Sequence, residues 1–165
     1  MAMRLHGVVA SPWTCRVVLA CAVKCIDLPP QRPAEGMKSP AYLKLNPFGK
    51  IPTLTDGRFV VYESAAILEY LDRKKPRPPL VPRAAKAAAR TRQIAAVVDG
   101  NLQDPVADLF RALVGQRPDD AASIDGWKAR AAQALDAIEN LLARDKFAAG
   151  ANFTLADCYL IPALS

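Results

Sequence analysis

The stretch from Asn46 to Leu54, NPFGKIPTL, gathers groups that suit the binding of a small peptide. Asn-Pro commonly starts a turn, and Gly49 permits backbone conformations that other residues avoid. A cis bond before Pro52, at a cost of roughly 0.5–1 kcal/mol, would leave the N–H and C=O of Ile51 facing outward. An exposed N–H and C=O pair can accept an extended peptide as an additional strand. The alternative is a trans proline at an ordinary strand entrance, which is the commoner isomer.

A helix start follows this stretch and suits an anion. Residues 63–71 show helical periodicity, with an apolar face that we predict to contain Ala66, Ile67, Tyr70 and Leu71. Glu63 and Ser64 stand at its first turn, where free N–H groups and the positive end of the helix dipole favour negative charge.

Ser11 and Pro12 mark a second helix start, as N-cap and first helical position of a helix that we predict to continue over 16–25. A hydroxyl at a helix N-terminus can cap the helix, and it can also stabilise a thiolate by donating a hydrogen bond. The two roles do not exclude each other. Cys15 lies one turn inside the same helix, and we expect it to be partly buried and unreactive.

Composition argues against several other classes. None of the four cysteines forms a C-x-x-C pair and His6 is the only histidine, so we expect no metal site. Cys21 and Cys25, four residues apart, should share a helix face as small core residues. The net charge of +6 is concentrated in residues 73–92, where no aromatic residue intervenes, which indicates a solvated face rather than a nucleic-acid site. Without a long apolar run, we expect no membrane segment and a reducing compartment such as the cytosol.

The first half of the chain alternates strand and helix signals. We predict a strand over 3–9, and a hairpin over 51–61 that turns at Asp56-Gly57. Between these, 26–45 holds prolines at 29, 30 and 33, so a second strand there is a stub, an edge strand or absent. A short helix over 41–45 should follow.

The second half is alanine-rich and lacks strand signals. Four prolines within 75–82 predict a linker at 76–82, which separates a domain over 1–75 from an all-helical domain over 83–165. Three helices are predicted, over 83–115, over 126–143 and from 155 onward. Pro105 should interrupt the first helix, and Gly150 should stop the second. Thr154 and Asp157 fit a capping box at the start of the third.

The motifs NPFGKIPTL and ESAAILEYL together resemble the glutathione-binding half of a cytosolic glutathione S-transferase, nearest the plant phi class. FTLADCYLIPAL and DGNLQDPVADLF resemble stretches of that family's second domain. The resemblance implies a thioredoxin-like α/β domain followed by an all-α helical domain that is shortened at its C-terminus. It also implies a homodimer that conjugates glutathione, its co-substrate, to small hydrophobic electrophiles, with no cofactor and no metal.

The same resemblance assigns roles to individual residues. Ser11 aligns with the catalytic serine of a Ser-x-x-x-x-Arg-Val pattern and would stabilise the glutathione thiolate. Ile51 would pair its main chain with the cysteinyl part of glutathione, held by a cis Pro52. Glu63 and Ser64 would hold the γ-glutamyl end.

Two lysines and an apolar group complete the expected site. Lys38 and Lys50 should face the glycyl carboxylate, although a solvated surface lysine is the commoner role for this residue type. The phi pattern commonly has a histidine before Lys38 and a glutamine where Lys50 stands. The electrophile would meet Trp13 and side chains from the long helix such as Phe110 and Val114.

Two other functions remain open. The shortened second-strand region and the shortened C-terminus favour a non-catalytic, transferase-like protein that binds glutathione or hydrophobic ligands. A structural partner domain, like the transferase-like half of translation elongation factor 1B gamma, has less support because no appended domain accompanies this sequence.

Overall fold

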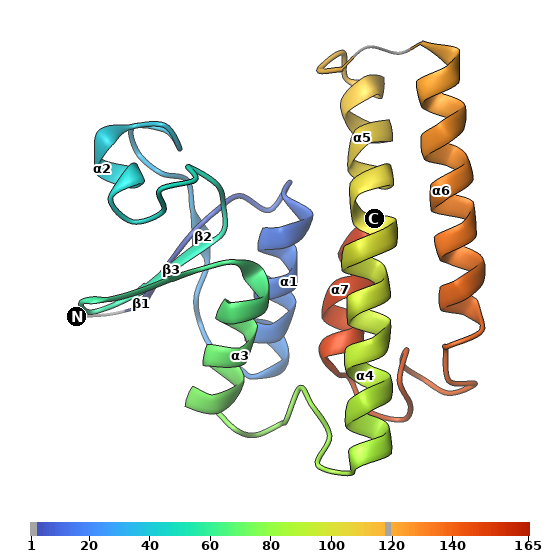
Figure 1. Cartoon of the computed structure of the whole chain (residues 1–165). Helices are drawn as coiled ribbons and strands as arrows, with labels where there is room; N and C mark the ends of the chain where they lie inside the picture. The colour runs from blue at the N-terminus through green and yellow to red at the C-terminus, as the bar shows by residue number, and fades with distance from the viewer. Residues whose placement is uncertain (1–2, 118–119) are drawn as a thin grey trace. The chain divides into compact units, whose positions relative to one another are not determined.

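The computed structural model of the protein describes residues 3–117 and 120–165 (Figure 1). Positions 1–2 of the first predicted domain and 118–119 of the second lie outside the described residues. The chain separates into two compact units, Met1–Leu80 and Val81–Ser165. The division falls inside the segment 76–82, which was predicted as the linker. The first unit is α/β and the second is helical, which confirms the predicted fold class.

Unit 1 is built on a mixed sheet. Its described strands are β1 (Met3–His6), β2 (Pro30–Gln31), β3 (Thr53–Asp56) and β4 (Phe59–Tyr62), in the order β2-β1-β3-β4. β2 is parallel to β1, and the other neighbours are antiparallel. The prolines around β2 limit it to a two-residue edge strand, one of the outcomes expected from the sequence. The helices are α1 (Pro12–Val23), α2 (Pro40–Leu43) and α3 (Ser64–Lys74).

Side-chain alternation along the sheet separates two faces. Leu5 and Leu54 are paired across β1 and β3 and fully buried. They form one core with residues of α1, of α3 and of the segment before β2, namely Val17, Cys21, Leu28, Ile67 and Leu71. The next pair in register, His6 and Thr53, faces the other way, toward α2, where the rings of His6 and Tyr42 meet edge to face at 5.9 Å. The sheet therefore lies between α1 and α3 on one side and α2 on the other (Figure 1).

The end of α1 corrects one prediction. The helix ends at Val23, and Cys25 adopts a left-handed conformation with φ +50°. The N–H groups of Cys25 and Ile26 bond back to the carbonyls of Ala22 and Cys21, which is the Schellman pattern of helix termination. Cys25 is consequently exposed while Cys21 is buried, so the expectation that the two share a helix face was wrong.

The buried face of α3 agrees with the prediction at Ile67 and Leu71, with Tyr70 partly buried against the same core, and differs at two positions. Ile67, Leu68 and Leu71 are buried, whereas Ala66 is exposed. The helix starts at Ser64, which is itself buried, so the buried stripe follows a spacing of three, four and seven residues from Ser64. The prediction was wrong for Ala66 and missed Leu68.

A fully buried lysine fixes the chain where it leaves unit 1. The ammonium of Lys24 lies 2.6 Å from a carboxylate oxygen of Asp72 and donates to the carbonyls of Lys75 and Pro78 at 2.7 and 2.8 Å. Asp72 also accepts the Leu80 N–H at 2.9 Å. These contacts join the ends of α1 and α3 to the proline-rich segment.

Unit 2 consists of helices in its described residues. They are α4 (Ala85–Val97), a π-helical turn η1 (Val98–Leu102), α5 (Gln103–Leu113), α6 (Ala121–Glu139) and α7 (Leu155–Ala163). The predicted interruption of the long helix is the π turn; Pro105 follows it in the first turn of α5, where a missing N–H costs least. No helix in the described part of the chain has the length and apolar character of a membrane span.

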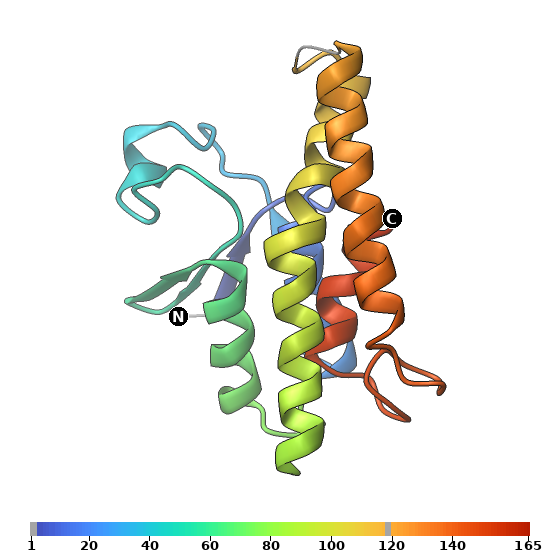
Figure 2. The same ribbon diagram turned by 45° about the vertical axis from the view of Figure 1, so that its right-hand side comes forward.

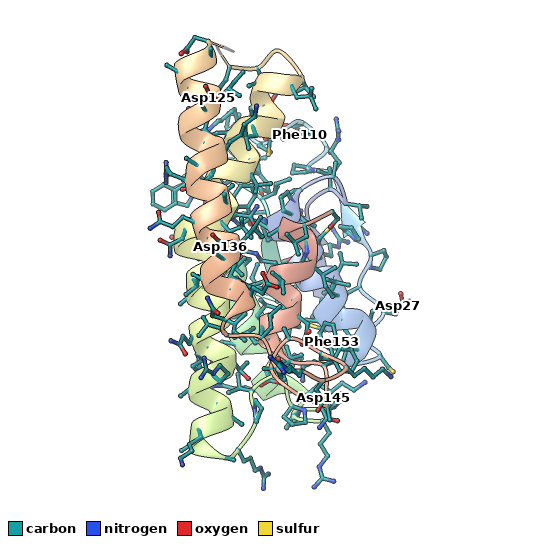
Figure 3. All side chains as sticks on the ribbon, turned by 90° about the vertical axis from the view of Figure 1, so that its right-hand side faces the viewer. Asp27, Phe110, Asp125, Asp136, Asp145 and Phe153 are labelled. Carbon is teal, nitrogen blue, oxygen red and sulfur yellow. The ribbon has the colours of Figure 1, made fainter. Side chains whose placement is uncertain are left out.

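The bounds of α6 differ from the prediction. Its N-cap is Asp120, which accepts the Ser123 N–H at 2.9 Å, so the helix starts five residues earlier than expected. It ends at Glu139, and a connection containing Asp145 and Phe153 leads to α7 (Figure 3). Gly150 does not stop α6; it pairs with Phe147 in an isolated bridge inside that connection.

The capping box of α7 is confirmed. Asp157 is buried, and one of its carboxylate oxygens accepts the N–H of Thr154 at 2.8 Å and the hydroxyl of Thr154 at 3.1 Å. The other oxygen accepts the Ala148 N–H at 2.8 Å, so Asp157 also ties the preceding connection to the helix.

Candidate functional site

Two hydroxyls predicted as functional lie at helix starts in unit 1. Ser11 is the N-cap of α1, and Ser64 is the first residue of α3. The two helices lie side by side and begin at the same end of the unit (Figures 1 and 2). Arg16, one turn into α1 and buried, donates from Nη1 to Ser64 Oγ at 3.5 Å. This cross-link between the first turns of α1 and α3 was not anticipated from the sequence.

The hydroxyl of Ser11 is placed to donate a hydrogen bond to an anion. Its oxygen accepts the Thr14 N–H at 3.4 Å, which confirms the N-cap, and the side chain is half-buried. No acceptor for its proton is found among the described residues, so the O–H can donate to a ligand. Gly7 allows β1 to end close to this turn, because a Cβ there would lie 2.6 Å from Thr14 Cγ2.

Cys15 has the surroundings of an unreactive thiol. It is half-buried, as expected, and its S–H donates to the Val9 carbonyl at 2.8 Å. Burial raises the pKa of the Cys15 thiol above its ordinary value, so its thiolate fraction at neutral pH is small. The geometry therefore leaves the helix start to the Ser11 hydroxyl.

The loop before β3 presents main-chain groups. The Ile51–Pro52 peptide is cis, as the family resemblance implied, and Ile51 is half-buried and outside the paired ladder of the sheet. Gly49 has φ +58°, and a Cβ there would lie 2.7 Å from the Met37 carbonyl oxygen. Only glycine allows the loop to approach the segment before α2 this closely.

The two predicted lysines differ in their contacts. The Lys38 ammonium donates to the Phe48 carbonyl at 3.1 Å, so its side chain crosses the loop beside Gly49. Lys50 lies in the loop itself, with an exposed side chain. Lys38 therefore contacts the loop that contains Lys50, and it does so through its ammonium group.

Glu63 occupies an unusual backbone conformation at the start of α3. It is the N-cap residue with φ +67°, and its side chain forms no capping bond. The carboxylate is exposed, whereas the neighbouring Ser64 is buried. Glu63 is thus available for a cationic group of a ligand, and Ser64 presents its hydroxyl against Arg16.

The side chains predicted to meet an electrophile are apolar and at least partly accessible. Trp13 is half-buried on α1 in unit 1. In unit 2, Phe110 and Val114 at the end of α5 are 60% and 47% exposed, and Leu113, which was not predicted, is 84% exposed. The end of α5 therefore carries an apolar surface; Phe110 is labelled in Figure 3.

Sequence reasoning missed three buried residues whose hydrogen bonds connect the predicted site residues to the fold, namely Arg16, Tyr42 and Thr53. Tyr42 and Asn46 both donate to the Lys50 carbonyl, at 2.7 and 2.9 Å. The sequence did mark Asn46 as a turn residue, and its Oδ1 accepts the Phe48 N–H at 3.1 Å as such a turn requires. Its second role, through Nδ2, has no local sequence signal.

The described residues form a thioredoxin-like α/β unit with two adjacent helix starts and an open main-chain loop, followed by a helical unit. Comparison with known proteins gives the family. The model of the glutathione S-transferase N-terminal domain matches residues 5–79, and that of the C-terminal domain matches residues 121–165. Glutathione S-transferase 3 of Zea mays is 36% identical over 99% of this chain and 78% of its own length. The chain belongs to the glutathione S-transferase family.

Other relatives show the breadth of the similarity. The maleylacetoacetate isomerase of Pseudomonas aeruginosa is 32% identical over 98% of this chain and 80% of its own length. Among solved structures, a theta-class glutathione S-transferase from Xanthomonas axonopodis pv. citri with glutathione bound superposes with a TM-score of 0.83. That likeness has 27% identity and covers 96% of this chain and 79% of the other.

Proposed function

We propose that this transferase activates glutathione for attack on hydrophobic electrophiles through a hydrogen bond from Ser11 to the thiolate. The observation that carries the proposal is the half-buried Ser11 hydroxyl at the N-terminus of α1, with its oxygen on the Thr14 N–H and its proton available. A free thiol has a pKa near 8.5, and each unit by which the site lowers it corresponds to about 1.4 kcal/mol. A hydroxyl donor and a helix N-terminus both favour the charged form.

The other parts of glutathione would contact the remaining predicted site residues of unit 1. The main chain of Ile51 would pair with the cysteinyl part, and Lys38 and Lys50 would attract the glycyl carboxylate. Glu63 would meet the α-amino group, and Ser64 the γ-glutamyl carboxylate.

Several finer properties belong to the same proposal. The motif NPFGKIPTL and the serine at position 11 support a place nearest the phi class. We expect the protein in a reducing compartment such as the cytosol. We also expect a homodimer, which a light-scattering mass would test, and no nucleic-acid or membrane partner.

The test separates thiolate stabilisation from helix capping. Ser11→Ala removes both roles, whereas Ser11→Asp keeps a good N-cap and places negative charge toward the thiolate. We expect both variants to lower kcat/KM with a chlorinated nitrobenzene at pH 6.5 by roughly 10- to 100-fold, because a hydrogen bond to a charged group contributes about 1.5–3 kcal/mol. Ser11→Thr should retain most activity. Wild-type rates in Ser11→Asp would show that capping is the only role of Ser11.

The non-catalytic alternative is tested in the same assay. A wild-type protein that is retained on immobilised glutathione but shows no conjugation above the uncatalysed rate would be a binding protein. The uncatalysed rate of glutathione alone, measured at each pH, provides the reference.

A further inference from the structure

Two buried donors converge on one carbonyl in the loop that precedes β3. The Tyr42 hydroxyl donates to the Lys50 carbonyl oxygen at 2.7 Å, and Asn46 Nδ2 donates to the same oxygen at 2.9 Å. Both donors also reach Thr53 Oγ1, at 2.9 and 3.2 Å. The segment from Lys50 to Thr53 is therefore held at both ends, with Ile51 between them.

The donors are themselves fixed in place. Tyr42 and Asn46 are 4% and 1% exposed, so their hydrogen bonds do not compete with bulk water. The orientation of the Asn46 amide is set by its Oδ1, which accepts the Phe48 N–H at 3.1 Å. The Tyr42 ring is held on its other side by the edge-to-face contact with His6 on β1. The rigid sheet and α2 thus set the direction of the Lys50 carbonyl.

The direction of the Lys50 carbonyl sets the direction of the next peptide group. The Lys50 C=O and the Ile51 N–H belong to one planar peptide unit, so a carbonyl fixed toward Tyr42 points the N–H the opposite way. That N–H and the Ile51 carbonyl are the groups proposed to pair with glutathione. A loop that is already ordered loses less conformational freedom on binding than a mobile loop does.

We propose that Tyr42 and Asn46 are positioning residues that set the affinity for glutathione by orienting the Ile51 main chain. The proposal rests on the proposed function, because it assumes that Ile51 meets glutathione. It assigns these residues no contact with the ligand and no part in the ionisation of the thiol. Their loss should therefore change the binding of glutathione and leave the chemical step nearly unchanged.

The decisive variant is Tyr42→Phe, which removes one hydroxyl and keeps the ring against His6. The matched control is Tyr70→Phe, the same change at a tyrosine of unit 1 whose hydroxyl bonds Asp56 at 2.5 Å, at the end of the sheet where the hairpin turns. We expect Tyr42→Phe to raise the KM and the calorimetric Kd for glutathione about 5- to 10-fold, with kcat within about twofold of wild type. Tyr70→Phe should change none of these values.

A second variant keeps the proposal falsifiable if Tyr42→Phe does not fold. Asn46→Asp retains the acceptor for the Phe48 N–H and loses the donor to Lys50, so it should raise KM and Kd in the same way. If the folded variants bind glutathione with the Kd of the wild type and have an unchanged KM, this inference is overturned. The proposed function is not affected by that result. An equal rise in KM for Tyr70→Phe overturns this inference as well. A wild-type protein that does not bind glutathione overturns the proposed function together with this inference.

Discussion

Asp157 holds the start of α7 with three hydrogen bonds, and its removal should destabilise unit 2. The carboxylate accepts the N–H groups of Ala148 and Thr154, both at 2.8 Å, and the Thr154 hydroxyl at 3.1 Å. Asp157→Ala leaves two buried main-chain donors without acceptors, at roughly 1–3 kcal/mol each, and removes half of the capping box. We expect the free energy of unfolding of unit 2 to fall by about 3–5 kcal/mol.

Urea unfolding can measure this loss in unit 2 alone. Trp127 lies on α6 and Trp13 on α1, so in a Trp13→Phe background the tryptophan fluorescence reports on unit 2. Asp125→Ala is the control, because Asp125 is exposed on α6 (Figure 3) and its loss should change stability by less than about 0.5 kcal/mol.

An intermediate variant tests the reasoning further. Asp157→Asn preserves the shape and one acceptor, so it should lose less stability than Asp157→Ala. If Asp157→Ala unfolds within about 1 kcal/mol of Asp125→Ala, the N–H groups of Ala148 and Thr154 find other partners. In that case Asp157 does not hold the connection to α7.

Three further predictions concern unit 1. Lys24→Met should cost unit 1 about 2–4 kcal/mol in urea, because Asp72 keeps its charge without a cation, and Asp72→Leu added to it should restore part of the loss. Burial, aided by Arg4, lowers the pKa of His6, so the unfolded chain takes up the proton first. The contribution of His6 to the free energy of unfolding should therefore be fully present above about pH 6.5 and be lost as the pH drops below that value. His6→Phe should flatten that part of the pH profile. Burial raises the pKa of Cys21 to about 11, so Ellman's reagent should label the exposed Cys25 first and reach Cys21 only on unfolding.

Features fixed by neighbouring residues were predictable from the sequence. The cap at Ser11 depends on an N–H three residues away, and the capping box at Thr154 and Asp157 has the same spacing. The hairpin is local as well, although its two-residue turn is Gly57-Arg58 and not the predicted Asp56-Gly57, since Asp56 pairs with Phe59 at the end of β3; Gly57 has φ +62°. In each case the geometry is complete within one turn of chain, so residue type and spacing suffice.

Features fixed by distant residues were not predictable in the same way. Lys24 reads as a surface lysine at a helix end, yet its ammonium is buried by the Pro78 carbonyl, 54 residues away. Arg16 meets Ser64 across 48 residues. The left-handed Cys25 stands where glycine or asparagine would have signalled the helix end. No local pattern distinguishes Lys24 and Arg16 from solvated residues, and none marks Cys25 as the end of the helix.

The proposed glutathione site draws on main-chain groups and helix starts more than on reactive side chains. Its polar side chains at the surface, Lys38, Lys50 and Glu63, are exposed, where a charge pair contributes about 0–1 kcal/mol. A buried hydrogen bond that orients a peptide group costs more to lose, because the abandoned carbonyl has no water to replace its donor. Residues such as Tyr42 can therefore control affinity without touching the ligand, and a search for reactive residue types alone passes over them.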